Sequence, residues 1–202
     1  PDALLHLHVV NPNAEWEQKL THLLSVLKLD NICVTSEQVK FNNLPQDKET
    51  TYYTCVRFLH LSQWLTQYQK PIVCTDIDGI VEKPFTPMIA ETAKHDVSLI
   101  LRMARHFPWL DISAGFLVIL PTRGATHFFS LVRNYLLHFI HRGELYWYLD
   151  QLALFCVLKM LERFGEPPVV NWLREDSQQF VWHLGHAHKD SYKLQEERFT
   201  RY

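Results

Sequence analysis

Strand-like and helix-like segments alternate along the first hundred residues, and this alternation limits the fold more than any other feature of the sequence. Strands are expected over residues 4–10 and 31–36, where apolar residues form short runs. Trp16 and several leucines recur at helical spacing over residues 14–28, and a second helix is expected over residues 50–68. Such alternation is typical of a mostly parallel sheet with helices packed on its faces. The sequence therefore predicts an α/β fold.

Later segments extend this prediction. Strands are expected over residues 72–78, 97–103, 113–121, 167–173 and 179–185, and helices over residues 86–94, 123–141 and 146–163. The run Ile72–Cys74 contains no polar residue, which is typical of a parallel strand buried on both faces. A length of 202 residues suits one core, so we expect residues 1–202 to form a single domain.

Charge and hydropathy exclude two classes of partner. The formal net charge is -2, and no basic block or stripe marks a nucleic-acid surface. The most apolar stretch, "LYWYLDQLALFCVLKML", is interrupted by Asp150 and Lys159, so no membrane span is expected. We therefore expect neither nucleic acid nor a membrane span among the interactions of this chain.

The cysteines indicate a reducing compartment. They lie far apart in the sequence and form no CxxC pair, which is typical of buried, reduced thiols in a cytoplasmic protein. These residues are Cys33, Cys55, Cys74 and Cys156. The opening segment, "PDALLHLHVV", has the pattern of neither a signal peptide nor a transit peptide. It looks like the middle of a longer protein.

Two carboxylates follow the apolar run at residues 72–74. Asp76 and Asp78 are two positions apart, so on an extended chain their side chains point to the same face. Ligands of open α/β sheets bind beyond the carboxyl ends of the strands, which is where this pair stands. Carboxylate oxygens suit Mg²⁺ or Mn²⁺. A solvated turn is the alternative, because Asp and Gly are common turn residues; we favour the metal site.

The same stretch also allows a different chemistry. "DIDGIV" at residues 76–81 resembles the opening motif of haloacid dehalogenase-type phosphatases, with Asp76 as the nucleophile and Asp78 as the general acid and base. In that superfamily the motif usually lies on the first strand, whereas some 75 residues precede it here. Ile80 stands where threonine is usual, and no downstream GDxxxD cluster is present. The phosphatase remains the second hypothesis.

Four short motifs favour the metal-binding interpretation. They are Arg57 with the following strand and the Asp76–Asp78 pair, "SAGFLVIL" at residues 113–120, "YLDQLALF" at residues 148–155 and "WHLGHAHK" at residues 182–189. In this order, over about residues 50–190, they resemble retaining glycosyltransferases of the glycogenin and lipopolysaccharide galactosyltransferase type. The resemblance is closer still to bacterial glycosyltransferases that carry tetratricopeptide repeats. It implies a GT-A fold and a nucleotide-sugar donor.

The resemblance also implies roles for the charged residues. Asp76 and Asp78, with His183 as the third ligand, would bind Mn²⁺ or Mg²⁺. The residues implied to contact the donor diphosphate and its metal are Arg57, Asp76, Asp78, Gly185 and Lys189. From its own position, Arg57 lies in a mostly apolar helix and needs a carboxylate or phosphate partner. The alternatives are a core histidine for His183 and a solvated lysine for Lys189.

Sugar and acceptor contacts are implied at two further motifs. Ser113, Ala114 and Gly115 would contact the substrate, although Ser113 stands where the family often has asparagine. Asp150 and Gln151 would border the sugar or the acceptor as the catalytic pair, and a helix-start cap explains them equally well. The aromatic run at residues 146–148 is expected to pack against the sheet rather than to line an acceptor cleft. A zinc site at His183, His186 and His188 is discounted, because no helix or cysteine pair fixes their spacing.

The implied function is metal-dependent sugar transfer with retention of anomeric configuration. The acceptor, whether glycan, lipid or protein, is not indicated, and a tetratricopeptide-repeat region is expected elsewhere in the full-length protein. The family's first strand has no counterpart here, since residues 4–13, "LLHLHVVNPN", resemble its second strand. For that reason a non-catalytic binding domain of the same fold is kept as a third hypothesis.

Overall fold

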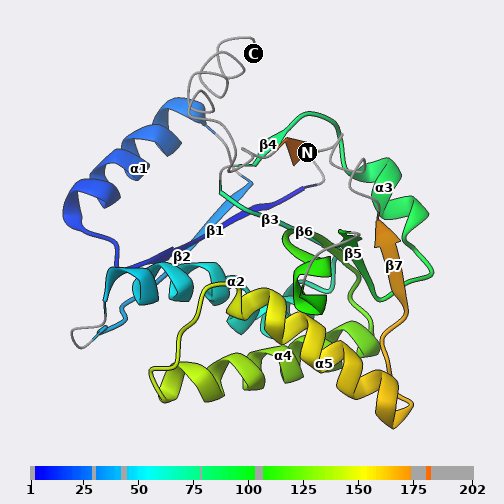
Figure 1. Ribbon diagram of the computed structural model, residues 1–202. Coiled ribbons are helices and arrows are strands. Elements are labelled where there is room, and N and C mark those ends of the chain that lie inside the picture. The colour runs from blue at the N-terminus through cyan, green and yellow to red at the C-terminus, as the bar shows by residue number, and fades with distance from the viewer. Residues whose placement is uncertain are drawn as a thin grey trace.

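The computed structural model describes residues 3–28, 31–41, 45–77, 79–102, 107–173 and 181–182. These residues form helices and strands, together with one short 3₁₀ helix, η1 (Figure 1). In chain order they are β1 (Leu5–Val10), α1 (Ala14–Leu27), β2 (Ile32–Glu37), α2 (Gln46–Tyr68), β3 (Ile72–Thr75), β4 (Ile80–Val81), α3 (Thr86–Glu91), β5 (Val97–Leu101), η1 (Pro108–Asp111), β6 (Ile112–Ile119), α4 (Arg123–His141), α5 (Leu149–Phe164), β7 (Val170–Leu173) and β8 (Val181–Trp182). The α/β class predicted from the sequence is confirmed.

A four-stranded sheet lies at the centre of the described residues, with its strands in the order β3-β6-β5-β7. β6 pairs antiparallel with both β3 and β5, and only β5 and β7 pair in parallel. Beside this sheet, β1 and β2 form a parallel pair, and β4 and β8 form an antiparallel pair. The prediction of a mostly parallel, Rossmann-like sheet is therefore wrong: the sheet is mixed.

The error has a physical origin in how buried strands are covered. Apolar runs such as Ile72–Cys74 were expected in a parallel sheet, because parallel strands are buried on both faces. In this structure both faces are covered although most pairings are antiparallel. Residues 102–111 join β5 to β6, which is shorter than the crossover of about a dozen residues that parallel pairing requires. Antiparallel pairing of these two strands follows from that short connection.

Two apolar layers cover the sheet. Helices α2, α4 and α5 pack on one face, where their large side chains, including Phe58, Phe128 and Leu154, meet Leu117 of β6. Helix α3 covers the other face, where Met88 packs against residues of the sheet that point the opposite way. Figure 1 shows α3 apart from α2, α4 and α5. The carboxyl end of β3 thereby lies at the edge of a firmly packed sheet.

Local signals set the helix boundaries. Asn13 and Thr122 accept hydrogen bonds from the backbone N–H groups of Trp16 and Ala125, so that α1 and α4 begin as the sequence predicts. Helix α2 begins after Pro45, four residues before the predicted Thr50.

Helix α5 begins later than expected, at Leu149 rather than at residue 146. Tyr148 precedes it in the left-handed conformation, with φ of 68°. Tyr146, Trp147 and Tyr148 are exposed, so the prediction that they pack against the sheet is wrong. A bulky residue with positive φ is uncommon, and such strain is found at functional sites.

Two other expectations concern hydropathy and the cysteines. No helix among the described residues has the length and apolar character needed to cross a membrane. The four cysteines are free thiols: Cys55 is buried, and the others are half-buried. Burial raises the pKa of the Cys55 and Cys74 thiols, which keeps both protonated. Their chemistry is that of inert core residues.

Candidate functional site

Asp76 occupies the position directly after β3, opposite Gly115 of β6. Its backbone N–H donates to the carbonyl oxygen of Gly115 at 3.0 Å, which extends the ladder between the two strands. A Cβ atom added to Gly115 would lie 2.8 Å from Asp76 Oδ2, closer than such contacts occur. The Asp76 carboxylate therefore lies over a glycine because no other residue would leave room for it.

Arg57 of α2 supplies the partner of this carboxylate. Its Nη1 forms an ion pair and hydrogen bond with Asp76 Oδ1, and its Nη2 lies 3.6 Å from Asp150 Oδ2. The guanidinium side chain is 17% exposed, and that of Asp150 is 8% exposed. An arginine at this depth needs counter-charges. The prediction that Arg57 has a carboxylate partner is confirmed, and the structure adds a second partner.

Asp150 and Gln151 open helix α5 and are both buried. Asp150 Oδ1 accepts a hydrogen bond from the backbone N–H of Gln151 at 2.8 Å, while its other oxygen faces Arg57. Burial raises the pKa of Asp150, although Arg57 and the Gln151 N–H act in the opposite direction. The residue thus makes a bond at the helix start and also belongs to the charged group around Arg57.

Two buried polar atoms of this group lack a hydrogen-bond partner among the described residues. They are Arg57 Nε and Gln151 Oε1, one a donor and the other an acceptor. Buried polar groups are nearly always paired in native proteins, with protein, water or a ligand. The group of Arg57, Asp76, Asp150 and Gln151 therefore has hydrogen-bonding capacity beyond what its own members use.

The remaining predicted site residues have different positions. Ser113 Oγ accepts a weak hydrogen bond from the Gly115 N–H at 3.4 Å and lies on the side of the strand where Asp76 stands. Ala114 is buried in the larger apolar core. Asp78, His183, Gly185 and Lys189 lie outside the described residues. Of the predicted metal ligands, the structure describes Asp76 alone, and the set as a whole stays a prediction.

The fold itself is similar to that of a glycosyltransferase involved in the glycosylation of the major capsid of PBCV-1. The match covers 96% of this chain and 99% of that chain, with a TM-score of 0.52 and 10% sequence identity. The chain has a glycosyltransferase-like fold. Mouse xyloside xylosyltransferase 1, in its apo form, matches over 84% of this chain and 72% of that chain, with a TM-score of 0.48 and 11% identity. No protein-family model and no curated protein matches the sequence.

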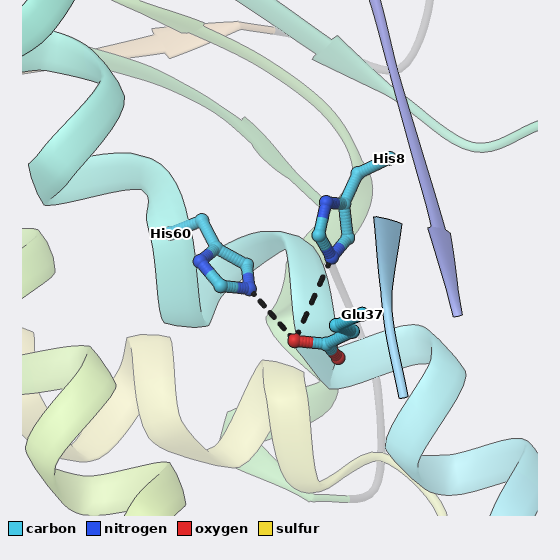
Figure 2. Close-up of side chains that lie close together, drawn as sticks. All are labelled: His8, Glu37 and His60. Carbon is cyan, nitrogen blue, oxygen red and sulfur yellow. Dashed lines mark hydrogen bonds and ion pairs between the residues drawn. The ribbon is translucent and has the colours of Figure 1, made fainter. Parts of the chain in front are cut away.

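The glycosyltransferase-like fold also brings together three residues that the sequence analysis does not select. His8 of β1, Glu37 of β2 and His60 of α2 point toward one another (Figure 2). One local signal was available, because His6 and His8 are two positions apart on a strand and share a face. The proximity of His8 to Glu37 depends on the register of β1 against β2, and no sequence motif encodes that register.

Replacing Gly115 with alanine is expected to displace the Asp76 carboxylate. The new Cβ atom would overlap Oδ2, so the carboxylate must move away from Arg57; loss of this half-exposed ion pair lowers the free energy of unfolding by about 1 kcal/mol. Urea denaturation measures this loss. In a background that carries Asp76→Ala, the added methyl group meets no carboxylate, and Gly115→Ala should then have little further effect. Equal losses in both backgrounds would show that the two residues do not meet.

Proposed function

We propose that this chain is a glycosyltransferase that transfers a sugar from a nucleotide-diphosphate donor to a glycan, lipid or protein acceptor. The observation that carries the proposal is the grouping of Arg57, Asp76 and Asp150 at the carboxyl end of β3. Motif resemblance selects all three residues independently of one another. Support also comes from the fold, which is shared with the capsid glycosyltransferase over nearly the whole chain.

The donor set around Asp76 suits a divalent cation. Arg57 engages Asp76 Oδ1, while Oδ2 lies over Gly115 and takes no part in that ion pair. Carboxylate oxygens are preferred ligands of Mg²⁺ and are common ligands of Mn²⁺. Asp76, with Asp78 and His183, would hold the ion. When bound, Mn²⁺ or Mg²⁺ supplies positive charge that offsets negative charge building on the departing diphosphate.

Protein groups around the ion would orient its ligand and add contacts to the diphosphate. Arg57 would hold Asp76 in one orientation, since its Nη1 pairs with Asp76 Oδ1 while its Nη2 lies beside Asp150. Lys189 and the backbone at Gly185 would add contacts to the diphosphate. These interactions strengthen as charge develops, which is the condition for lowering a barrier.

Gln151 and Ser113 would orient the transferred sugar. Gln151 Oε1, which has no hydrogen-bond partner among the described residues, can accept a hydrogen bond from a sugar hydroxyl, and the Ser113 hydroxyl lies on the Asp76 side of β6. In the retaining mechanism that we propose, the departing phosphate oxygen itself takes the proton of the acceptor. The chain therefore needs no side-chain base, and Asp150 acts by holding Arg57 and the start of α5 in place.

A turnover assay tests this function against the phosphatase hypothesis. The chain should slowly release nucleoside diphosphate from one member of a panel of nucleotide sugars with Mn²⁺, because water replaces the missing acceptor. It should not release phosphate from an aryl phosphate with Mg²⁺. Steady turnover of the aryl phosphate that Asp76→Asn abolishes would overturn the proposal in favour of a phosphatase. Inertness toward every nucleotide sugar, with and without simple sugar acceptors, would favour a binding domain.

A further inference from the structure

The cluster of His8, Glu37 and His60 has the geometry of a cation site. Glu37 Oε2 lies 3.7 Å from His8 Nε2 and 3.3 Å from His60 Nε2, and the three ligand atoms all lie within 4.8 Å of one another. Figure 2 shows both imidazole rings directed at the same carboxylate oxygen. The side chain of His8 is 11% exposed, that of Glu37 23% and that of His60 26%, so the cluster is partly buried and solvent can reach it.

Glu37 is held by a contact outside the cluster. The Tyr52 hydroxyl donates a hydrogen bond of 2.7 Å to Glu37 Oε1, the oxygen that does not face the histidines. Oε2 is thereby turned toward His8 and His60. His60 in turn stacks on Trp64, with ring centroids 5.4 Å apart. Supporting contacts of this type orient ligand side chains at metal sites.

A chain of hydrogen bonds also connects His8 to α2. Four contacts run from β1 to α2: His8 Nδ1 to Thr35 Oγ1 at 2.8 Å, Thr35 Oγ1 to His6 Nε2 at 2.7 Å, His6 Nδ1 to Tyr68 Oη at 3.1 Å, and Tyr68 Oη to Cys33 Sγ at 3.8 Å. One assignment of protons gives every donor an acceptor. In it, His8 Nδ1–H donates to Thr35, Thr35 to His6, His6 Nδ1–H to Tyr68, and Tyr68 to Cys33.

This assignment leaves His8 Nε2 as a bare lone pair facing the cluster. The atom is buried and has no hydrogen-bond partner among the described residues. Glu37 is no hydrogen-bond partner for this nitrogen, because His8 Nε2 lies 3.7 Å from Glu37 Oε2, which is too long for a hydrogen bond. A cation at the centre of the cluster would take up the lone pair.

We propose that His8, Glu37 and His60 bind a divalent transition-metal ion of the Zn²⁺ class. Imidazole nitrogen and carboxylate oxygen are ligands that Zn²⁺ prefers, at about 2.0–2.2 Å. Tetrahedral coordination at that length places neighbouring ligand atoms about 3.4 Å apart, close to the two separations from Glu37 Oε2. The site is distinct from the group around Asp76, and the proposal does not depend on the proposed function.

Bound metal would add a further link between β1, β2 and α2, which already meet through hydrogen bonds and ring contacts. β1 and β2 pair with each other and, among the described strands, with none of the central sheet. Their contact with α2 uses rings and polar groups, such as His6 against Trp64 at 4.4 Å. An ion held by one residue from each of β1, β2 and α2 would fasten this pair of strands to the helix. Binding to the folded state alone also raises its stability.

Titration of the chelator-treated full chain with Co²⁺ and Zn²⁺ tests the proposal. We expect one Co²⁺ per chain with the visible absorption of tetrahedral cobalt, its displacement by Zn²⁺, and a higher melting temperature with Zn²⁺. His60→Gln and Glu37→Gln should each weaken Zn²⁺ binding at least tenfold, while His22→Gln, an exposed histidine on α1, should leave it unchanged. Circular dichroism of each variant without metal establishes that the fold persists.

Two results would overturn the proposal. The first is Zn²⁺ affinity that His60→Gln and Glu37→Gln leave intact but that replacement of His183, His186 and His188 together removes, which would place the ion on those histidines. The second is the absence of saturable binding of Co²⁺ or Zn²⁺ to the parent chain.

Discussion

Replacing Arg57 with methionine is expected to lower the free energy of unfolding by about 3 kcal/mol, because it leaves two carboxylates without their shared cation. Asp150 is the more affected partner, since its side chain is only 8% exposed. Methionine preserves most of the aliphatic volume, so the loss reports the charge rather than a cavity. Urea denaturation of the two proteins at neutral pH measures it.

A double variant separates this electrostatic cause from a packing defect. Arg57→Met combined with Asp150→Asn removes the buried negative charge along with its partner, and it should be more stable than the sum of the two single losses predicts. Arg57→Lys should be intermediate, because a single ammonium group cannot bridge both carboxylates as the guanidinium fork does. Strict additivity in the double variant would mean that Arg57 and Asp150 do not interact.

Asp76→Asn is expected to reduce donor turnover by about 100-fold or more, since the loss of several kcal/mol of charge stabilisation has that effect on a rate. Asparagine has the same shape and keeps a hydrogen-bond acceptor for Arg57, but it is a poor ligand for Mn²⁺. The Asp76 side chain is 41% exposed, so the fold should tolerate the change. Release of nucleoside diphosphate from the preferred nucleotide sugar gives the rate.

Asp47→Asn is the matched control for that experiment. Asp47 is exposed in the first turn of α2, the helix that carries Arg57. The substitution makes the same chemical change on the same helix without touching the site, and turnover should stay within about twofold of the parent, as a near-neutral surface change implies. Equal losses in both variants would show that the effect of Asp76→Asn comes from net charge rather than from its position.

The sequence predicted the ion pair of Arg57 because a charged residue in an apolar helix is expected to be buried. Arg57 stands in a mostly apolar helix, and a charge in such a place requires a carboxylate or phosphate partner. That reasoning needs no knowledge of topology, and the ion pair between Arg57 and Asp76 satisfies it. Asp150 lies much farther along the chain, so its contact with the same guanidinium depended on how α5 packs on α2.

The same reasoning could not predict strand direction or the histidine cluster. An apolar run such as Ile72–Cys74 indicates that both faces of the strand are covered. It does not indicate whether the neighbouring strand runs parallel or antiparallel to it. For β5 and β6, the short connection between them indicates antiparallel pairing. His8, Glu37 and His60 come from three elements, and their meeting depends on strand register and helix rotation, which local patterns do not specify.

Isothermal titration with a nucleoside diphosphate and Mn²⁺ tests the donor site most directly. The account predicts saturable binding of at least one nucleoside diphosphate to the parent chain, binding that needs Mn²⁺ or Mg²⁺ and that Asp76→Asn weakens at least tenfold while Asp47→Asn does not. Binding of equal strength in the parent and in Asp76→Asn, or no binding of any nucleoside diphosphate with either cation, would contradict the assignment of Asp76 and Arg57 to a sugar-nucleotide site.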